Sequence, residues 1–205
     1  KSPKNEREKE IPAELITGAL LAPGALDGLN AEARDILLIC VETGCRQSEI
    51  YRTPLDDIHV DHEYPHFYLR SIRGVRELKN EASERYVPLV GVALPAMRRV
   101  VERGGFKRYS GKSGWSKLVN EYIRDNKILP TGYTIGGLRH SWEGRMRRAG
   151  IHTDDRGVMM GHSVTNIRNR EEYGDYLLHE RYAIAESLAF AIEDPVEIGR
   201  ASCRE

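Results

Sequence analysis

The sequence of 205 residues lacks several features that define whole classes of protein. No apolar run approaches the roughly 18 residues that a membrane-spanning helix needs. The first ten residues, KSPKNEREKE, are charged throughout and lack the apolar core of a signal peptide. The three cysteines, Cys40, Cys45 and Cys203, form neither a CxxC metal motif nor an even disulfide framework, which favours a reducing compartment. We therefore expect a cytoplasmic protein without membrane contact.

The sequence also lacks net charge, because 31 Lys and Arg residues balance 31 Asp and Glu residues. The charges are nevertheless segregated along the chain. Residues 98–148 hold 13 basic and 4 acidic side chains, whereas residues 1–66 hold 7 basic and 13 acidic ones. A run of like charges is often only a solvated surface. The alternative is a basic groove that binds phosphate groups.

Helical patterns dominate the chain. Asn30 is a suitable N-cap for a helix whose apolar residues follow helical spacing, and Gly44 is placed to end it. Pro12 can open a short helix before it. Further helices are predicted over 93–103, 115–126, 137–150, 153–161 and 177–194.

Three short runs between these helices favour strands. Residues 57–61, 66–73 and 84–90 are enriched in β-branched and aromatic residues and predict a small antiparallel sheet. The segment between the second and third runs is predicted to be a hairpin loop with Lys79 at its tip. The expected fold class is therefore mainly α with a small three-stranded antiparallel sheet (α+β).

Four local groups carry side chains suited to chemistry. They are Arg46 with Glu49 in TGCRQSEI, Lys79, Arg139 with His140 in GLRHSWEGRM, and His162 with Tyr173 across MGHS and EEYGD. Taken singly, each has an ordinary structural interpretation, such as a surface ion pair or a buried histidine. Together they supply several cationic donors and one hydroxyl nucleophile. No metal-ligand cluster or Gly-rich phosphate loop accompanies them, so we expect no metal and no other cofactor. The set suits metal-free chemistry on a phosphodiester, where Arg forks bind the non-bridging oxygens.

In their order and local context these groups resemble the catalytic domain of tyrosine recombinases, also called phage integrases. The matching strings are TGCRQSEI, LKNEASERYVPL, LRHS, MGHS and EEYGD. The resemblance covers roughly residues 11 to 192. It implies a tyrosine recombinase catalytic domain over 11–194, preceded by a linker or N-terminal extension over 1–10. Residues 195–205 are interpreted as a C-terminal tail, either unstructured or a cloning remnant.

The resemblance implies a site-specific recombinase that cuts and rejoins DNA through a 3′-phosphotyrosine intermediate. In that role Tyr173 is the nucleophile, and Arg46 and Arg139 clamp the scissile phosphate. Lys79 protonates the leaving 5′ oxygen, and His162 donates a hydrogen bond to the phosphate. Integration or excision of a mobile element is the expected process. A type IB topoisomerase-like enzyme and a DNA-binding module that has lost catalysis remain alternatives.

Other residues near these positions have supporting or rival roles. The resemblance implies that Glu49 orients the Arg46 pocket and that His140 is structural. The family often has a histidine where this chain has Gly136, so the proton acceptor for Tyr173 is unassigned. Tyr176 is the rival nucleophile, and the glycine that follows Tyr173 favours Tyr173.

The implied partner is double-stranded DNA. The helices of the basic stretch, residues 98–148, are expected to lie along the duplex and contact its phosphates. The candidate DNA contacts are Lys107, Arg108, Lys112, Lys117 and Arg145. Family members usually carry a further N-terminal DNA-binding domain, so the chain is expected to be a fragment of a longer protein. The final helix is expected to dock on a neighbouring subunit of a tetramer on DNA, or on its own domain, with a monomer possible without DNA. The expected setting is the bacterial cytoplasm or nucleoid, with the gene carried by a phage or mobile element.

Overall fold

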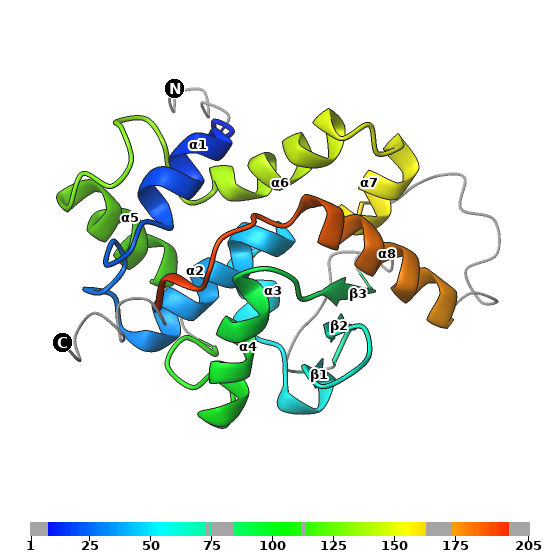
Figure 1. Ribbon diagram of the computed structural model, residues 1–205. Coiled ribbons are helices and arrows are strands. Elements are labelled where there is room, and N and C mark those ends of the chain that lie inside the picture. Colours follow the sequence, from blue (N-terminus) through cyan, green and yellow to red (C-terminus); the bar gives the residue numbers. More distant parts are fainter. Residues whose placement is uncertain (1–7, 73, 75–83, 112–113, 163–173, 197–205) are drawn as a thin grey trace, which may run out of the picture.

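The computed structural model describes residues 8–72, 74, 84–111, 114–162 and 174–196, and only the backbone of residues 174–177. Helices surround a central helix, α2, and a small sheet lies at one side of them (Figure 1). The elements in chain order are α1 (Ala13–Leu15), the π-helix η1 (Ile16–Leu20), α2 (Ala31–Thr43), α3 (Gln47–Tyr51), the 3-10 helix η2 (Leu55–Asp57), β1 (Ile58–His59), β2 (His66–Leu69), β3 (Arg85–Pro88), α4 (Ala93–Glu102), α5 (Trp115–Asp125), α6 (Gly137–Arg148), α7 (Thr153–Met160) and α8 (Gly174–Leu188).

Helix α2 begins and ends where local chemistry predicts. The Asn30 side chain accepts a hydrogen bond from the Ala33 N–H, which caps the first turn. Gly44 ends the helix with φ of 60°, a left-handed conformation that glycine adopts without steric cost. Most of α2 is buried, because α4 and α6 pack against it on different sides and Trp115 of α5 donates to the Ala33 carbonyl.

The sheet is antiparallel, with strand order β1-β2-β3. Phe67 of β2 lies opposite Val87 of β3, and both side chains are buried. The strands are shorter than predicted, but the three-stranded antiparallel sheet agrees with the prediction from the sequence. The predicted hairpin loop with Lys79 at its tip falls on residues outside those that the structure describes.

The chain after α8 returns across α2 toward α4 (Figure 1). The Phe190 N–H donates to Glu42 Oε1 at 3.0 Å, and Arg99 of α4 forms an ion pair with Asp194. Val196 is 4% exposed and belongs to the core, so the packed domain extends past the predicted boundary at residue 194. Helix α8 packs on β3 of the same chain. No described helix is both long and apolar enough to cross a lipid bilayer.

Arg145 is part of this core, which corrects its assignment as a DNA contact. Its side chain is 8% exposed, and its Nη1 lies 2.8 Å from Glu42 Oε2 and 3.0 Å from the Leu188 carbonyl. The guanidinium also lies over the Trp142 and Phe190 rings. A cation enclosed by aromatic rings and a carboxylate has no face left for a phosphate. Arg145 therefore anchors the end of α8 to α2.

Candidate active site

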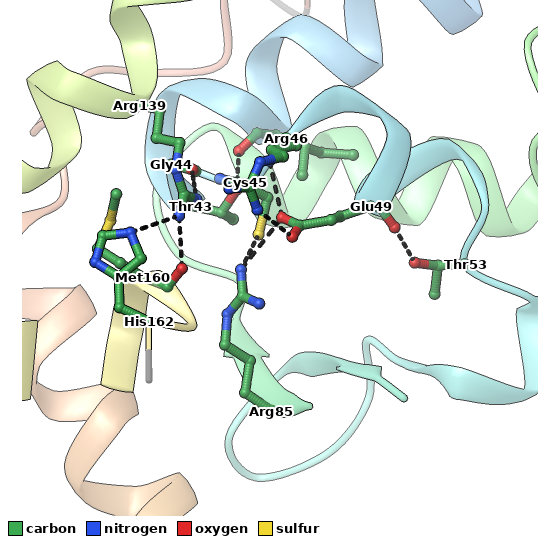
Figure 2. Close-up of polar contacts among 11 residues, drawn as sticks. Thr43, Gly44, Cys45, Arg46, Glu49, Thr53, Arg85, Arg139, Met160 and His162 are labelled. Carbon is green, nitrogen blue, oxygen red and sulfur yellow. Dashed lines mark hydrogen bonds and ion pairs between the residues drawn. The ribbon is translucent and has the colours of Figure 1, made fainter. Parts of the chain in front are cut away.

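Arg139 connects three separate segments of the chain. It lies in the first turn of α6, and its Nη1 donates to the Gly44 carbonyl at 2.8 Å. Its Nη2 donates to the Met160 carbonyl at 2.6 Å and lies 3.3 Å from His162 Nε2. Both carbonyls are at helix ends, where backbone oxygens lack intrahelical partners. The guanidinium is thus held in one orientation by the ends of α2 and α7 (Figure 2).

Gly44 makes this arrangement possible through its missing side chain as well as its φ. A Cβ at this position would lie 2.5 Å from Trp142 Cδ1 on α6. Helices α2 and α6 therefore approach each other closely at the point where Arg139 reaches across. Any larger residue would push α6, which carries Arg139, away from the end of α2, which leads into Arg46.

The Glu49 carboxylate accepts hydrogen bonds from both the backbone and the side chain of Arg46 at the start of α3. Glu49 Oε2 accepts from the Arg46 backbone N–H at 2.9 Å, and Glu49 Oε1 lies 3.1 Å from Arg46 Nη1. The Glu49 side chain is 8% exposed, whereas that of Arg46 is 51% exposed. The buried carboxylate thus positions Arg46 while much of the guanidinium stays open to a ligand.

Arg85 is a third arginine of the site, and it was not predicted from the sequence. It lies on β3, is 3% exposed, and its Nη2 is 3.3 Å from Glu49 Oε2 and 3.5 Å from Cys45 Sγ. Figure 2 shows Arg85 and Arg139 reaching the turn from Gly44 to Arg46 from different elements. The sequence did hold one signal for Arg85. It lies two residues before Val87, so both side chains are on the same, buried face of the strand, where a charged residue needs a polar partner.

The charges of the site favour an anionic ligand, because three guanidinium groups surround one carboxylate. Burial alone would raise the pKa of Glu49, but Arg85, the Arg46 N–H and the other arginines together lower it. Partial desolvation and the charge of Arg139 lower the pKa of His162, which is therefore neutral near pH 7. Since Arg139 can only donate, His162 Nε2 accepts and the ring proton is assigned to Nδ1.

The structure brings together four of the predicted site residues: Arg46, Glu49, Arg139 and His162. Lys79, Lys112 and Tyr173 lie outside the residues that the structure describes. His140 is exposed on α6 and has no hydrogen bond or ion pair to any described residue, so nothing in the described part connects it with the site.

The remaining predicted DNA contacts are exposed but lie elsewhere. Lys107 and Arg108 belong to a loop whose backbone N–H groups donate to the Glu32 carboxylate in the first turn of α2. The Arg46 and Arg139 site is at the opposite end of this helix. Lys117 on α5 is 80% exposed, with its Nζ 3.8 Å from Glu121. Their contact with DNA stays a prediction.

The lowered pKa of Glu49 predicts a pH dependence of stability. An ionised Glu49 stabilises the folded state above its ordinary pKa of about 4.5, and this contribution is lost as pH falls through the lower folded-state value. The variant Glu49→Gln is expected to have a smaller free energy of unfolding at pH 7 and a weaker loss of stability below pH 4.5. Urea unfolding at several pH values measures both. An unchanged pH profile would show that Glu49 does not carry this charge interaction.

We compared the chain with protein families, curated sequences and solved structures, and only solved structures match it. No protein-family model and no curated protein sequence matches the chain. Among solved structures, the Tn1549 transposon integrase bound to transposon right-end DNA matches with a TM-score of 0.57 and 18% identity, covering 100% of this chain and 69% of that one. The same integrase bound to a circular intermediate DNA matches with a TM-score of 0.60 and 15% identity, covering 98% and 68%. XerA recombinase matches with a TM-score of 0.56 and 13% identity, covering 100% and 67%.

The chain has the fold of these integrase and recombinase domains. The expected fold, mainly helical with one three-stranded antiparallel sheet, is confirmed. At 13 to 18% identity the likeness concerns the fold, so the chemistry must be argued from the residues of this chain.

Proposed function

We propose that the protein is a site-specific DNA recombinase that cuts and rejoins strands without a metal ion. The observation that carries this proposal is the cluster of Arg46, Arg85, Arg139 and His162, in which Arg139 binds carbonyls at the ends of α2 and α7. Arg46 is half-exposed and Arg139 is fixed by two carbonyls, so a phosphate that enters meets oriented donors. The similar integrase structures hold DNA, which is consistent with this ligand.

The proposed reaction assigns one task to each side chain. The Tyr173 hydroxyl oxygen attacks the scissile phosphorus, and the bond from phosphorus to the 5′ oxygen breaks. Lys79 gives the departing oxygen a proton. Arg46 and Arg139 stabilise the extra negative charge on the non-bridging oxygens, and the Nδ1–H of His162 donates to one of them. Attack by a 5′ hydroxyl on the phosphotyrosine reverses these steps and rejoins a strand.

The proposed biological setting follows from this chemistry. The substrate is double-stranded DNA, and the process is integration or excision of a mobile element in the bacterial cytoplasm. Exchange between two duplexes needs several active sites, so we propose a tetramer on DNA with α8 at subunit contacts and a monomer in its absence. Analytical ultracentrifugation with and without DNA measures this assembly.

The nucleophile is tested by covalent capture. A pool of nicked duplexes with a random central region is incubated with the protein, denatured, and the DNA attached to protein is sequenced. We expect a covalent adduct on selected sequences and its complete loss in Tyr173→Phe, because phenylalanine has no attacking oxygen. The selected sequence then serves as the nicked substrate for the other variants.

Tyr176→Phe is the matched control and is expected to form the adduct normally. Loss of the adduct in Tyr176→Phe, with retention in Tyr173→Phe, would identify Tyr176 as the nucleophile. Relaxation of supercoiled plasmid without joining of two duplexes would favour the topoisomerase alternative. Failure of the wild-type protein to form any adduct while it still binds duplex DNA would favour a DNA-binding module without catalysis.

A further inference from the structure

The Arg85 side chain lies between two segments that both contribute to the candidate site. The side chain is almost fully buried, with an exposure of 2%. Its Nη2 lies 3.3 Å from Glu49 Oε2 and 3.5 Å from Cys45 Sγ (Figure 2). The first segment is therefore residues 44–49, the turn into α3 that includes Arg46.

The same guanidinium also packs against Gly161, which ends α7. A Cβ built on Gly161 would lie 2.5 Å from Arg85 Nη1, 2.9 Å from Cζ and 3.3 Å from Nε. The guanidinium therefore takes the space beside the Gly161 backbone that a side chain would fill. His162 follows directly in the sequence, so the second segment is residues 160–162.

Arg139 joins the same two segments at a second point, through the carbonyls of Gly44 and Met160. The two arginines come from different elements, because Arg139 is on α6 and Arg85 is on β3. Their exposures also differ, since Arg139 is partly exposed and Arg85 is enclosed. A phosphate can reach Arg139 but not Arg85. Any effect of Arg85 on such a ligand therefore passes through the residues that it holds.

The Glu49 carboxylate connects Arg85 with Arg46. Glu49 Oε2 accepts from the Arg46 backbone N–H and lies next to Arg85 Nη2, while Oε1 lies 3.1 Å from Arg46 Nη1. One carboxylate thus contacts a buried guanidinium and a half-exposed one. Burial raises the pKa of Glu49, and the charge of Arg85 is the largest of the effects that lower it. Arg85 therefore keeps this carboxylate ionised and in place.

We propose that Arg85 is a positioning residue for the proposed reaction, which holds Glu49 and the end of α7 in one arrangement. Arg46 and His162 are thereby aligned on the same phosphate group, which Arg85 does not touch. This inference rests on the proposed function. A planar guanidinium suits the task, because one nitrogen pairs with the carboxylate while other atoms of the group contact Gly161. The point charge of a lysine cannot make both contacts in this way.

The first test is the single-turnover rate of adduct formation, measured against DNA concentration on the selected nicked duplex. Arg85→Met is expected to lower the limiting rate by about 10²-fold, because small misplacements of the groups around a reacting atom have effects of this size. The DNA concentration that gives half the limiting rate is expected to stay the same, since Arg85 does not contact DNA. Arg85→Lys keeps the charge beside Glu49 and is expected to recover only part of the rate.

A double variant separates alignment of the site from support of the fold. In Glu49→Gln, Arg85→Met both buried charges are removed, which is expected to recover much of the melting temperature lost in Arg85→Met. The rate is expected to stay as low as in Arg85→Met, and the two single losses are not expected to multiply, because Arg85 acts through Glu49.

Arg99→Met is the matched control, because it also breaks a buried pair of an arginine with a carboxylate. Arg99 Nη2 lies 2.8 Å from Asp35 Oδ1, and the two side chains are 12% and 0% exposed. Helix α4, which carries Arg99, contributes no residue to the candidate site. Arg99→Met is expected to lower the melting temperature and to retain the wild-type limiting rate.

A second measurement needs no cleavage. The pKa of the Glu49 carboxyl group, followed by NMR, is expected to rise in Arg85→Met because burial then acts without its largest opposing charge. The same pKa is expected to be unchanged in Arg99→Met.

A wild-type limiting rate in Arg85→Met or in Arg85→Lys would overturn the inference, as would full recovery of the rate in the double variant. Weaker DNA binding with an unchanged limiting rate would also overturn it, because Arg85 would then act as a DNA contact. An unchanged pKa of Glu49 in Arg85→Met would refute this inference alone. Absence of any adduct with the wild-type protein would refute the proposed function itself, so the two failures are distinguishable.

Discussion

Arg139→Lys is expected to reduce the single-turnover rate of adduct formation by at least 10²- to 10³-fold, the usual effect of removing one oriented donor from a site of developing charge. One guanidinium holds the Gly44 carbonyl, the Met160 carbonyl and His162 Nε2 simultaneously. A lysine ammonium keeps the charge but cannot hold these three groups in one plane while it also faces a phosphate. The rate is measured on the selected nicked duplex, with circular dichroism to verify the fold.

Arg147→Lys is the control for this substitution on the same helix. Its side chain is 65% exposed and its ion pair with Glu10 tolerates a point charge, so it should retain the wild-type rate. A normal rate in Arg139→Lys would show that the planar fork has no part in cleavage and would contradict the proposed clamp.

The second large effect concerns stability. Arg145→Ala is expected to lower the free energy of unfolding by about 3–5 kcal/mol, because it leaves Glu42 buried without its charged partner. Burial already acts to raise the pKa of Glu42, and Arg145 offsets part of this effect. Loss of the guanidinium also removes its contacts with Trp142 and Phe190 and its bond to the Leu188 carbonyl. Urea unfolding at pH 7 gives the difference directly.

Two further variants separate this effect from simple loss of a positive charge. Arg148→Ala breaks the partly exposed pair with Glu10 and is expected to cost about 1 kcal/mol or less. The double variant Glu42→Gln, Arg145→Met removes both charges and should recover much of the lost stability. An Arg145→Ala protein of normal stability but weaker DNA binding would restore the original assignment of Arg145 as a DNA contact.

Local sequence rules predicted the elements whose ends depend on one or two residues. Asn30 and Gly44 bound α2 as expected, since a cap needs only its own side chain or backbone freedom. Helix α4 ends within one residue of its predicted end. Helix α3 was missed because five residues are too few for a periodic pattern. The strands were predicted too long, because the extent of a strand depends on its partner.

The sequence alone also identified Arg46, Glu49, Arg139 and His162 as members of one site, because their local strings resemble those of a known family. It did not identify Arg85. Arg85 reaches the site from the inner face of a strand. Such a placement follows from packing between distant segments, which no local pattern encodes.

Charge shows most clearly what the sequence determined and what the tertiary structure decided. The sequence determined that residues 98–148 are strongly basic within a neutral chain. The fold decided which partner each of these cations has. Arg99 and Arg103 form ion pairs with Asp35, and Arg145 forms one with Glu42. Of these four arginines, only Arg139 is part of the candidate site. The reason is physical, because a buried charge must have a partner, and only the packing of α2 against α4 and α6 determines which cations are paired and which can bind a phosphate.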